Sequence, residues 1–372
     1  MSPSTENKIN LAVIGAGLVS DYHHVPGIRL DPRARLVAVC DTDEALLEKR
    51  KLDWQVDKVT SDPEEIFSDE DVDGVIIATP NFTHKELAIS AAVNGKHIMC
   101  EKPLGLSADE VAAMYGAAKA GGVVHMTAFT YRFAPSMRYL KHLVQRGDLG
   151  TPRHFRSQRF LDLPETSWGW RQYKDKAGAG DLFDMTIHRI DFAQELLGPI
   201  KKICGSVARF AERTETADGS SCPPSEVDDW SALIGDFECG AVGVWEGTTL
   251  AKGYNREGFG HEWAEINGSE ASAVYRLHEP NVLLIGRHGG DLEPVEVPPE
   301  FLKPEDSPRD PGAGEPATVF RYDLAWEFIS AIQDDRDAVP SFWDGWSAQV
   351  IADAALTSRE EGRWIDIEQP PR

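Results

Sequence analysis

An acid and an imidazole stand four residues apart in the segment GAGDLFDMTIHRID, residues 178–191. On a helix, Asp184 and His188 share one face, and Asp191 continues it. The other residues are mostly apolar, so the helix is expected to be largely buried, where an acid–imidazole pair needs a reason. We interpret the pair as a proton acceptor with an acid that positions it. An exposed face of a core helix is the alternative.

The start of this helix and its metal-binding capacity can also be predicted. Gly178 and Gly180 permit tight turns, and Asp181 is predicted to cap the helix. A metal bound by His188 and the two acids would lack a second imidazole ligand, so we expect no metal site here.

A lysine with a constrained backbone follows a short apolar stretch. Residues 97–100 predict a strand, which Glu101, Lys102 and Pro103 end. Pro103 disfavours helical geometry at Lys102. Burial and a neighbouring positive charge both lower the pKa of a lysine. Lys102 is therefore predicted to bond to a substrate hydroxyl or to take its proton. Without this position at the end of a strand, an ordinary surface lysine would be the better interpretation.

A dinucleotide site is predicted at the opening segment NLAVIGAGLVS. Residues 11–14 suit a strand buried on both faces of a parallel sheet. The glycines that follow permit a sharp turn close to a phosphate, and a helix beginning near Leu18 directs its N–H groups at the pyrophosphate. An ordinary strand–turn–helix is the alternative, because Ser20 replaces the usual Gly or Ala. The predicted cofactor contacts here are Gly15, Ala16, Gly17, Leu18 and Val19.

An acid after the second predicted strand, residues 35–40, favours NAD over NADP. Asp41 stands near the spacing expected for the residue that binds the adenosine ribose hydroxyls and repels a 2′-phosphate. No Lys or Arg follows it before Lys49.

Further cofactor contacts are predicted at the carboxyl ends of the next strands. Residues 74–79 read as a buried strand, and a polar loop and a helix to about Val93 follow. For His84, a helix-entry residue bonded to the backbone is an equal alternative. A strand over 121–129 completes a βαβ series, and its end sets a predicted domain boundary at 129/130. The contacts expected from this region are Thr79, Pro80, Asn81, His84, Glu101 and Lys102.

The second predicted domain, residues 130–372, changes from helical to strand patterns. Two hairpins between 200 and 285, with turns near Glu238–Gly240 and at Asn267–Gly268, indicate an open, mainly antiparallel sheet. Trp245 and Trp263 are expected on its free face or in the pocket. Helices over 318–333 and 344–361 are predicted to pack back on the first domain. The fold class is thus an α/β, doubly wound Rossmann domain followed by an α+β domain.

The connecting segment, residues 151–177, combines aromatic and basic side chains. Aromatic faces stack on sugar rings, and arginines bond to sugar hydroxyls, so this composition suits a carbohydrate pocket or the edge of the cofactor. The candidates are Arg156, Trp168 and Lys174 for the substrate, and Trp170 and Arg171 for the cofactor.

Composition excludes several classes of protein. The net charge is −23 and no basic block occurs, which argues against nucleic-acid and membrane partners. Five cysteines without a CxxC pair indicate reduced thiols in the cytoplasm and no zinc site. Residues 1–10 lack a signal pattern, and no apolar run reaches membrane-spanning length.

The combined spacing of GAGLVS, Asp41, TPNFTH, EKP, TYRFAP and GAGDLFDMTIHRID resembles the Gfo/Idh/MocA family. The resemblance covers nearly the whole chain and implies that Lys102, Asp184 and His188 meet beside the nicotinamide. It also implies a substrate contact from Tyr131, a cofactor contact from Arg132, and a homodimer or homotetramer formed through the free sheet face. SWGWR, HMTAF and PSFWDGW are most similar to dehydrogenases that act on levoglucosan and glycosides.

Three functions follow from this interpretation. The first is NAD-dependent oxidation of a secondary hydroxyl of a sugar, glycoside or polyol, with Asp184 orienting and either Lys102 or His188 as the base. The second is a redox-neutral cleavage of glycosides through transient oxidation by the same residues. The third is a non-enzymatic regulator that binds a dinucleotide, against which retention of all three catalytic candidates argues.

Overall fold

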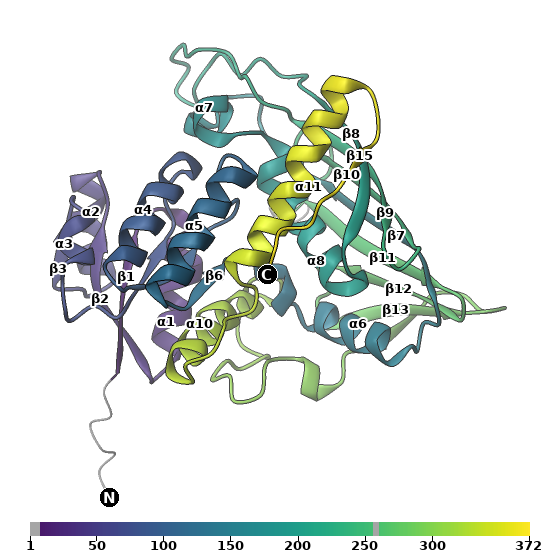
Figure 1. Ribbon diagram of the computed structural model, residues 1–372, viewed down its shortest axis with the longest axis horizontal. Helices are drawn as coiled ribbons and strands as arrows, with labels where there is room; N and C mark the ends of the chain where they lie inside the picture. Colours follow the sequence, from purple (N-terminus) through teal and green to yellow (C-terminus); the bar gives the residue numbers. More distant parts are fainter. Residues whose placement is uncertain (1–7, 256–259) are drawn as a thin grey trace, which may run out of the picture.

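The computed structural model describes residues 8–255 and 260–372 (Figure 1). The sequence analysis expected no signal pattern in residues 1–10. Of these, residues 1–7 lie outside the described residues. Two sheets dominate the fold, one near each end of the view, with the long helix α11 (Phe342–Glu361) between them (Figure 1).

The first sheet contains six parallel strands in the order β3-β2-β1-β4-β5-β6 within the described chain. This order confirms the predicted doubly wound arrangement, and its switch point lies between β1 and β4. The strands are β1 (Ile9–Ile14), β2 (Ala34–Cys40), β3 (Lys58–Thr60), β4 (Gly74–Ile77), β5 (His97–Cys100) and β6 (His125–Thr127).

Helices cover both faces of this sheet. In β1, Leu11 and Val13 belong to one core with Val25 of α1, whereas Ala12 and Ile14 belong to a second core that includes residues of α4 and α5. The uninterrupted apolar run is therefore explained by burial on both faces. The helices are α1 (Val25–Leu30), α2 (Glu44–Asp53), α3 (Glu64–Phe67), α4 (Asn81–Val93) and α5 (Ala108–Gly121).

The second sheet has nine strands among the described residues, in the order β14-β13-β12-β11-β7-β10-β9-β8-β15. Only the pair β7–β10 is parallel in the register of the described strands. The bounds are β7 (Pro152–Phe160), β8 (Ile200–Ala208), β9 (Trp230–Phe237), β10 (Val242–Thr248), β11 (His261–Gly268), β12 (Ala271–Arg276), β13 (Val282–Arg287), β14 (Glu293–Glu296) and β15 (Ile365–Asp366).

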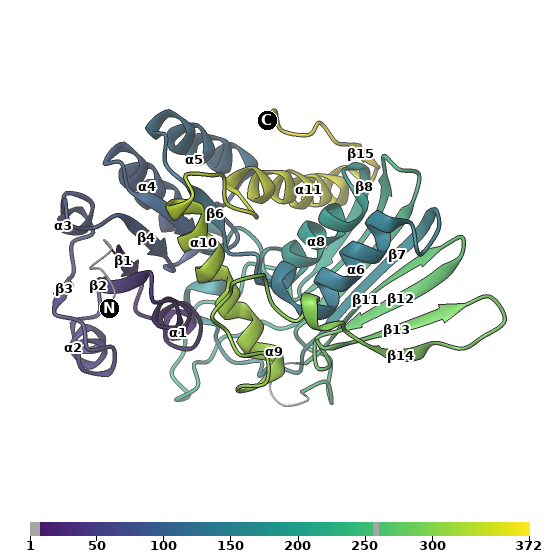
Figure 2. The same cartoon turned by 90° about the horizontal axis from the view of Figure 1, so that it is seen from below.

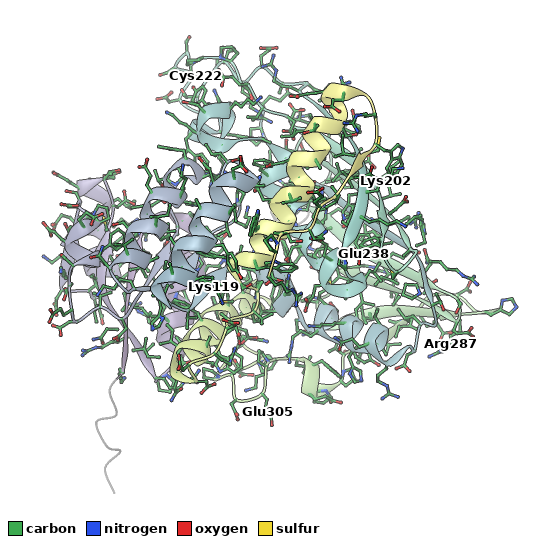
Figure 3. The ribbon with its side chains drawn as sticks, viewed as in Figure 1. Lys119, Lys202, Cys222, Glu238, Arg287 and Glu305 are labelled. Atoms are coloured by element: carbon green, nitrogen blue, oxygen red, sulfur yellow. The ribbon has the colours of Figure 1, made fainter. Side chains whose placement is uncertain are left out.

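Helices pack on one face of the second sheet, and its other face carries no helix among the described residues (Figure 2). They are α6 (Pro135–Arg146), α8 (Ile187–Leu197) and α11. Arg287, at the end of β13, marks the tip of the sheet farthest from the first one (Figure 3).

Two expectations for this sheet are wrong. The second hairpin turns at residues 269–270, not at Asn267–Gly268, because Gly268 continues β11 and pairs with Pro152. A Cβ at Gly268 would lie 1.9 Å from the carbonyl oxygen of Leu149, which explains the glycine without a turn. Trp245 lies in the core, fully buried, and its indole N–H donates to the Arg189 carbonyl oxygen. Trp263 is half-buried on the free face, as predicted.

The C-terminal segment returns to the first sheet. The amide of Thr127 in β6 donates to the Pro340 carbonyl at 2.9 Å, and the amide of Ala108 in α5 donates to the Asp353 carboxylate of α11 at 2.7 Å. Short helices α7 (Lys174–Ala177) and α9 (Pro316–Val319) and the helix α10 (Asp323–Gln333) complete the fold. The return brings residues near 320 to the cleft between the sheets. The domain boundary at 129/130 stays a prediction.

Candidate active site

A cavity of about 610 Å³ lies where segments of the two sheets meet. One part of its wall comes from the first helix and from the carboxyl ends of β4 and β5. The rest comes from the segment after β6, from β7, from the segment before α8 and the first turn of α8, and from residues 318–321 before α10. The predicted site residues that it brings together are Val19, Thr79, Asn81, Glu101, Lys102, Tyr131, Trp168, Trp170, Arg171, Asp184 and His188.

Lys102 and Asp184 form an ion pair in this cavity. The Lys102 ammonium donates to Oδ1 of Asp184 at 2.8 Å and to the Asp184 carbonyl oxygen at 2.7 Å. Burial opposes ionisation of Asp184, but the charges of Lys102 and Arg171 outweigh it and hold the pKa of Asp184 below its usual value. The acid is therefore an anion that fixes the lysine.

His188 lies beside this pair with its imidazole enclosed by aromatic rings. The ring centroids of His188 and Tyr131 are 4.7 Å apart in an edge-to-face contact, and Phe129 makes a similar contact at 5.8 Å. Its Nδ1 is buried, with no hydrogen-bond partner in the described chain. Burial, followed by the charges of Lys102 and Arg321, lowers the pKa of His188 well below its usual value. The imidazole is thus neutral.

The acid and the imidazole are presented by a π-helical turn, Leu182–Thr186, which continues into α8. A Cβ at Gly180 would lie 1.7 Å from the carbonyl oxygen of Asp228, which precedes β9. Glycine is therefore required where the two segments touch. Asp228 accepts from the amides of Gly180 and Leu182 at 2.8 and 3.0 Å. Asp181, predicted as the cap, has helical backbone angles instead, and its carboxylate accepts from Thr186 and Ser231.

Two adjacent histidines of the first helix also reach the site. His23 and His24 belong to the π-helical turn Ser20–His24, which leads into α1, and both are buried. His24 Nε2 lies 2.9 Å from Oε1 of Glu101, the residue before the catalytic lysine candidate. His23 lines the cavity, and neither of its ring nitrogens has a hydrogen-bond partner among the described residues.

The glycine turn fits a dinucleotide. Gly15 has φ of 99°, and a Cβ there would lie 2.4 Å from the Ala78 carbonyl oxygen, so only glycine brings the turn against β4. A Cβ at Gly17 would meet nothing within 4 Å, which leaves that side of the turn open. The amide of Ala16 donates to Oδ2 of Asp41 at 2.7 Å, so the acid lies beside the turn. These features match a pyrophosphate at the helix start and a ribose at Asp41.

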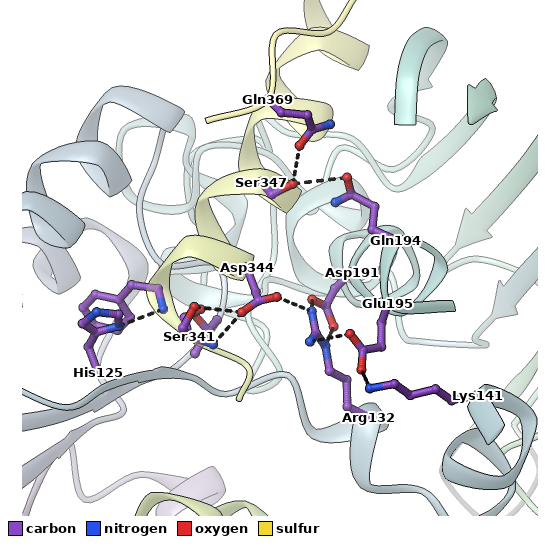
Figure 4. A network of polar contacts seen from close by, with 12 residues as sticks. His125, Arg132, Lys141, Asp191, Gln194, Glu195, Ser341, Asp344, Ser347 and Gln369 are labelled. Carbon is purple, nitrogen blue, oxygen red and sulfur yellow. Dashed lines mark hydrogen bonds and ion pairs between the residues drawn. The ribbon is translucent and has the colours of Figure 1, made fainter. Parts of the chain in front are cut away.

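Arg132, predicted to bind the cofactor, is placed elsewhere. It is buried between α8 and α11, and it pairs with Asp191 at 2.5 Å, Asp344 at 2.9 Å and Glu195 at 3.0 Å (Figure 4). Asp191 therefore does not join Asp184 and His188 in the cavity, because Arg132 binds its carboxylate. The role of this network is to connect the segment after β6 with two helices.

His84, Arg156 and Lys174 also lie outside the cavity wall. His84 is the backbone-bonded residue of the alternative prediction, since its two ring nitrogens lie 2.9 Å from the carbonyl oxygens of Pro103 and Thr79. Arg156 projects from the free face of the second sheet and pairs with Glu265. Lys174 is exposed at the start of α7. The alternation of β7 sends Arg156 and Arg159 to opposite faces of the sheet, so Arg159 and not Arg156 lines the cavity.

Among the cavity residues that the sequence analysis did not propose for the site are Tyr22, Arg159, Thr318 and Arg321. Arg159 is buried and pairs with Glu262 at 2.7 Å. Its inward direction could have been found from the alternation of β7, since Phe155 and Ser157 are buried with it. For Thr318 and Arg321 no local signal existed, because they reach the site only through the return of the C-terminal segment.

Two family models match the chain. A model of the oxidoreductase family with an NAD-binding Rossmann fold matches residues 9–129, and the GFO/IDH/MocA C-terminal domain matches residues 137–274. Levoglucosan dehydrogenase from Pseudarthrobacter phenanthrenivorans is 30% identical, with 97% of this chain and 98% of the relative covered. The chain belongs to the Gfo/Idh/MocA family of oxidoreductases. The resemblance noted from the motifs is thereby confirmed.

Other members of the Gfo/Idh/MocA family are similar over the same length. Myo-inositol 2-dehydrogenase from Thermotoga maritima is 30% identical, with 97% of this chain and 99% of the relative covered. A solved complex of levoglucosan dehydrogenase with NADH and levoglucosan is 30% identical, with a TM-score of 0.88 and 98% and 100% of the two chains covered. The protein is thus an NAD-binding oxidoreductase, as its glycine turn and Asp41 predict.

Three global features concern the described ranges, 8–255 and 260–372. No helix there combines the length and the hydropathy that a membrane crossing requires. The same ranges contain no cluster of three or more His, Cys, Asp or Glu side chains that could hold a metal ion. All five cysteines are free thiols.

Proposed function

We propose that the protein oxidises a secondary hydroxyl of a sugar, glycoside or polyol with NAD. The ion pair between Lys102 and Asp184, next to the neutral imidazole of His188, is the observation that supports this function most strongly. NAD, when bound, supplies a nicotinamide carbon that accepts a hydride. The residues around the cavity have to bind the alcohol, orient its C–H bond and remove its proton.

His188 is assigned as the base. A neutral imidazole accepts a proton, and the lowered pKa of His188 keeps it neutral at physiological pH. Lys102 has three N–H donors, of which two are directed at Asp184. The third donor is assigned to the substrate hydroxyl oxygen, where it would stabilise the negative charge that develops as the proton leaves.

The cofactor and the sugar are assigned to different parts of the wall. The turn Gly15–Val19 and Asp41 would hold the pyrophosphate and the adenosine ribose. Thr79, Pro80, Asn81, Glu101, Trp170 and Arg171 would surround the nicotinamide end. Tyr131, which contacts His188, and Trp168 line the cavity and would contact the sugar ring.

Purified protein with NAD or NADP and a panel of sugars, polyols and glycosides tests this function. We expect NADH to accumulate with at least one compound, with NAD preferred over NADP. Cleavage of a glycoside without accumulation of NADH would contradict the dehydrogenase function and favour the redox-neutral cleavage of glycosides. If no compound of the panel is consumed and the protein binds a partner protein in a nucleotide-dependent way, the regulator function would be favoured.

We also propose that the free face of the second sheet joins two copies of the chain in the cytoplasm. Ile234 of β9 and Val244 of β10 are neighbours in register, and they are exposed at 49% and 38%. The five free thiols support a reducing compartment. Light scattering should give a mass of two or four chains, and Ile234→Asp should shift it toward one. A wild-type protein with the mass of one chain would contradict this assembly.

A further inference from the structure

One wall of the cavity places two guanidinium groups around Tyr131. Arg159 donates to the Tyr131 hydroxyl at 3.4 Å, and the Arg321 guanidinium lies 5.1 Å from the centroid of the Tyr131 ring. The same ring contacts the imidazole of His188. Both arginines line the cavity, so this wall adjoins the place where the substrate hydroxyl is assigned.

The charges of the two arginines are balanced differently. Arg159 is compensated by Glu262, which is buried with it. Arg321 donates from Nε to the Ala317 carbonyl at 3.2 Å and stacks on Tyr131 and Phe320, but no carboxylate of the described residues forms an ion pair with it. A guanidinium without an acid partner therefore faces the cavity, next to the hydroxyl-bearing Thr318.

The cavity as a whole is cationic in an acidic protein. Its lining contains four cations, Lys102, Arg159, Arg171 and Arg321, and two acids, Glu101 and Asp184, whereas the chain carries a net charge of −23. Both acids already have partners, namely His24 and Lys102. A positively charged cavity attracts anions. The phosphates of the cofactor would explain positive charge near the glycine turn, but not at the other end of the cavity.

Arg321 acts at the other end, beside the reacting groups. Its charge is one of the causes, after burial, that lower the pKa values of His23 and His188. The effect of Arg321 on His188 agrees with the geometry, since the Tyr131 ring contacts both side chains. A ligand anion that compensates Arg321 would thus be part of the molecule held against His188.

We propose that Arg321 binds a carboxylate of the substrate, so that the preferred substrates are sugar acids, such as uronic or aldonic acids, and not neutral sugars. This inference rests on the proposed function, whose substrate class it narrows. The planar fork of a guanidinium matches the two oxygens of a carboxylate, and the Tyr131 ring holds the fork in place. Thr318 offers a hydroxyl donor beside it.

Binding to the full chain saturated with NADH tests the proposal without requiring turnover. The probes are D-glucuronate and D-galacturonate, D-glucose and D-galactose as their neutral counterparts, D-gluconate, and D-glucose 6-phosphate, titrated by calorimetry. We expect at least one acid to bind about tenfold or more tightly than its neutral counterpart, which corresponds to about 1.4 kcal/mol. Equal binding within every pair, or no binding of any acid, would overturn the proposal. Tightest binding of the phosphate would overturn the assignment to a carboxylate.

Three variants assign the effect to the arginine. Arg321→Gln should reduce the acid-to-neutral ratio of affinities to near one, whereas Arg321→Lys, which keeps the charge, should retain part of it. Arg29→Gln removes one positive charge from an exposed site outside the cavity and should keep the wild-type ratio. An unchanged ratio in Arg321→Gln would overturn the proposal. So would a loss of NADH affinity of about tenfold in that variant, because the arginine would then belong to the cofactor site.

The two proposals fail in distinguishable ways. Oxidation of neutral sugars with no preference for their acids would overturn the role of Arg321 and leave the dehydrogenase intact. Tight binding of a sugar acid that is never oxidised would overturn the dehydrogenase and leave the carboxylate site.

Discussion

The ammonium of Lys102 lies 2.8 Å from Oδ1 of Asp184, although the two residues are 82 positions apart in the chain. The bond joins the end of β5 in the first sheet to the π-helical turn that precedes α8. It makes the lysine a fixed donor, because a second bond to the Asp184 carbonyl holds the same nitrogen. The proposed chemistry depends on this bond and on the imidazole beside it.

Replacement of either proton-handling residue should reduce turnover strongly. Lys102→Ala removes the donor to the developing oxyanion, and His188→Ala removes the base. We expect kcat to fall by about 10²–10⁴-fold in each variant. Steady-state kinetics with the best sugar of the panel would measure this effect, and normal turnover in both variants would contradict the assignment. Lys174→Ala, at an exposed position outside the cavity wall, is the matched control for Lys102.

The acid limb of the pH profile should lie at unusually low pH. The pKa of His188 is lowered from its usual 6.5 by burial and by the charges of Lys102 and Arg321. The imidazole therefore stays neutral at a pH where an ordinary histidine would be protonated, and kcat/KM should fall only well below pH 6.5. This limb should disappear from the residual activity of His188→Gln. A limb at or above pH 6.5 that persists in the variant would exclude His188 as the base.

Asp41 should determine the choice of cofactor. Its carboxylate lies beside the glycine turn, where it would accept bonds from the ribose hydroxyls of NAD and repel the 2′-phosphate of NADP. Asp41→Ser should lower the ratio of kcat/KM for NAD over NADP by about tenfold or more, an effect of roughly 1.4 kcal/mol. Glu44→Gln, which removes a nearby exposed acid, should leave the ratio unchanged. An unchanged ratio in Asp41→Ser would assign the selection to another residue.

Arg132 should contribute to stability. Arg132→Met leaves the buried carboxylate of Asp191 and the half-buried carboxylates of Glu195 and Asp344 without their shared cation. The loss of one partner of a buried ionic network costs about 3–5 kcal/mol. Chemical denaturation at neutral pH would measure this loss, and Arg29→Met, at an exposed site, should change the free energy of unfolding by about 0.5 kcal/mol or less. A cost below about 1 kcal/mol in Arg132→Met would show that the network contributes little.

The sequence predicts those parts of the site that have local signals. A glycine turn after an apolar run, a lysine before a proline, and an acid and imidazole on one helix each carry their own constraint. These signals marked Lys102, Asp184 and His188 one by one, whereas their meeting was implied only by the family resemblance; the structure has all three in the lining of one cavity. The doubly wound sheet followed from the same kind of signal, since strands buried on both faces lack alternation.

Other residues depend on contacts between distant segments. Arg132 was expected at the cofactor, but acids from two helices far apart in the sequence, α8 and α11, bind it. Arg321 reaches the cavity because the C-terminal segment returns past the first helix. Asp191 faces Arg132 and not the cavity, which also depends on the packing of the segment after β6 against α8. Such effects appear only when the packing of the whole chain is known.

The transfer of hydrogen from the sugar carbon to the cofactor tests the central claim most directly. The protein would be incubated with NAD and a sugar that is deuterated at all its carbons, and the reduced cofactor would be analysed by mass spectrometry. We predict that the NADH gains one deuterium while the sugar loses one, and that Lys102→Ala slows this transfer. Consumption of the sugar with every deuterium retained, and with no label in the cofactor, would contradict the account.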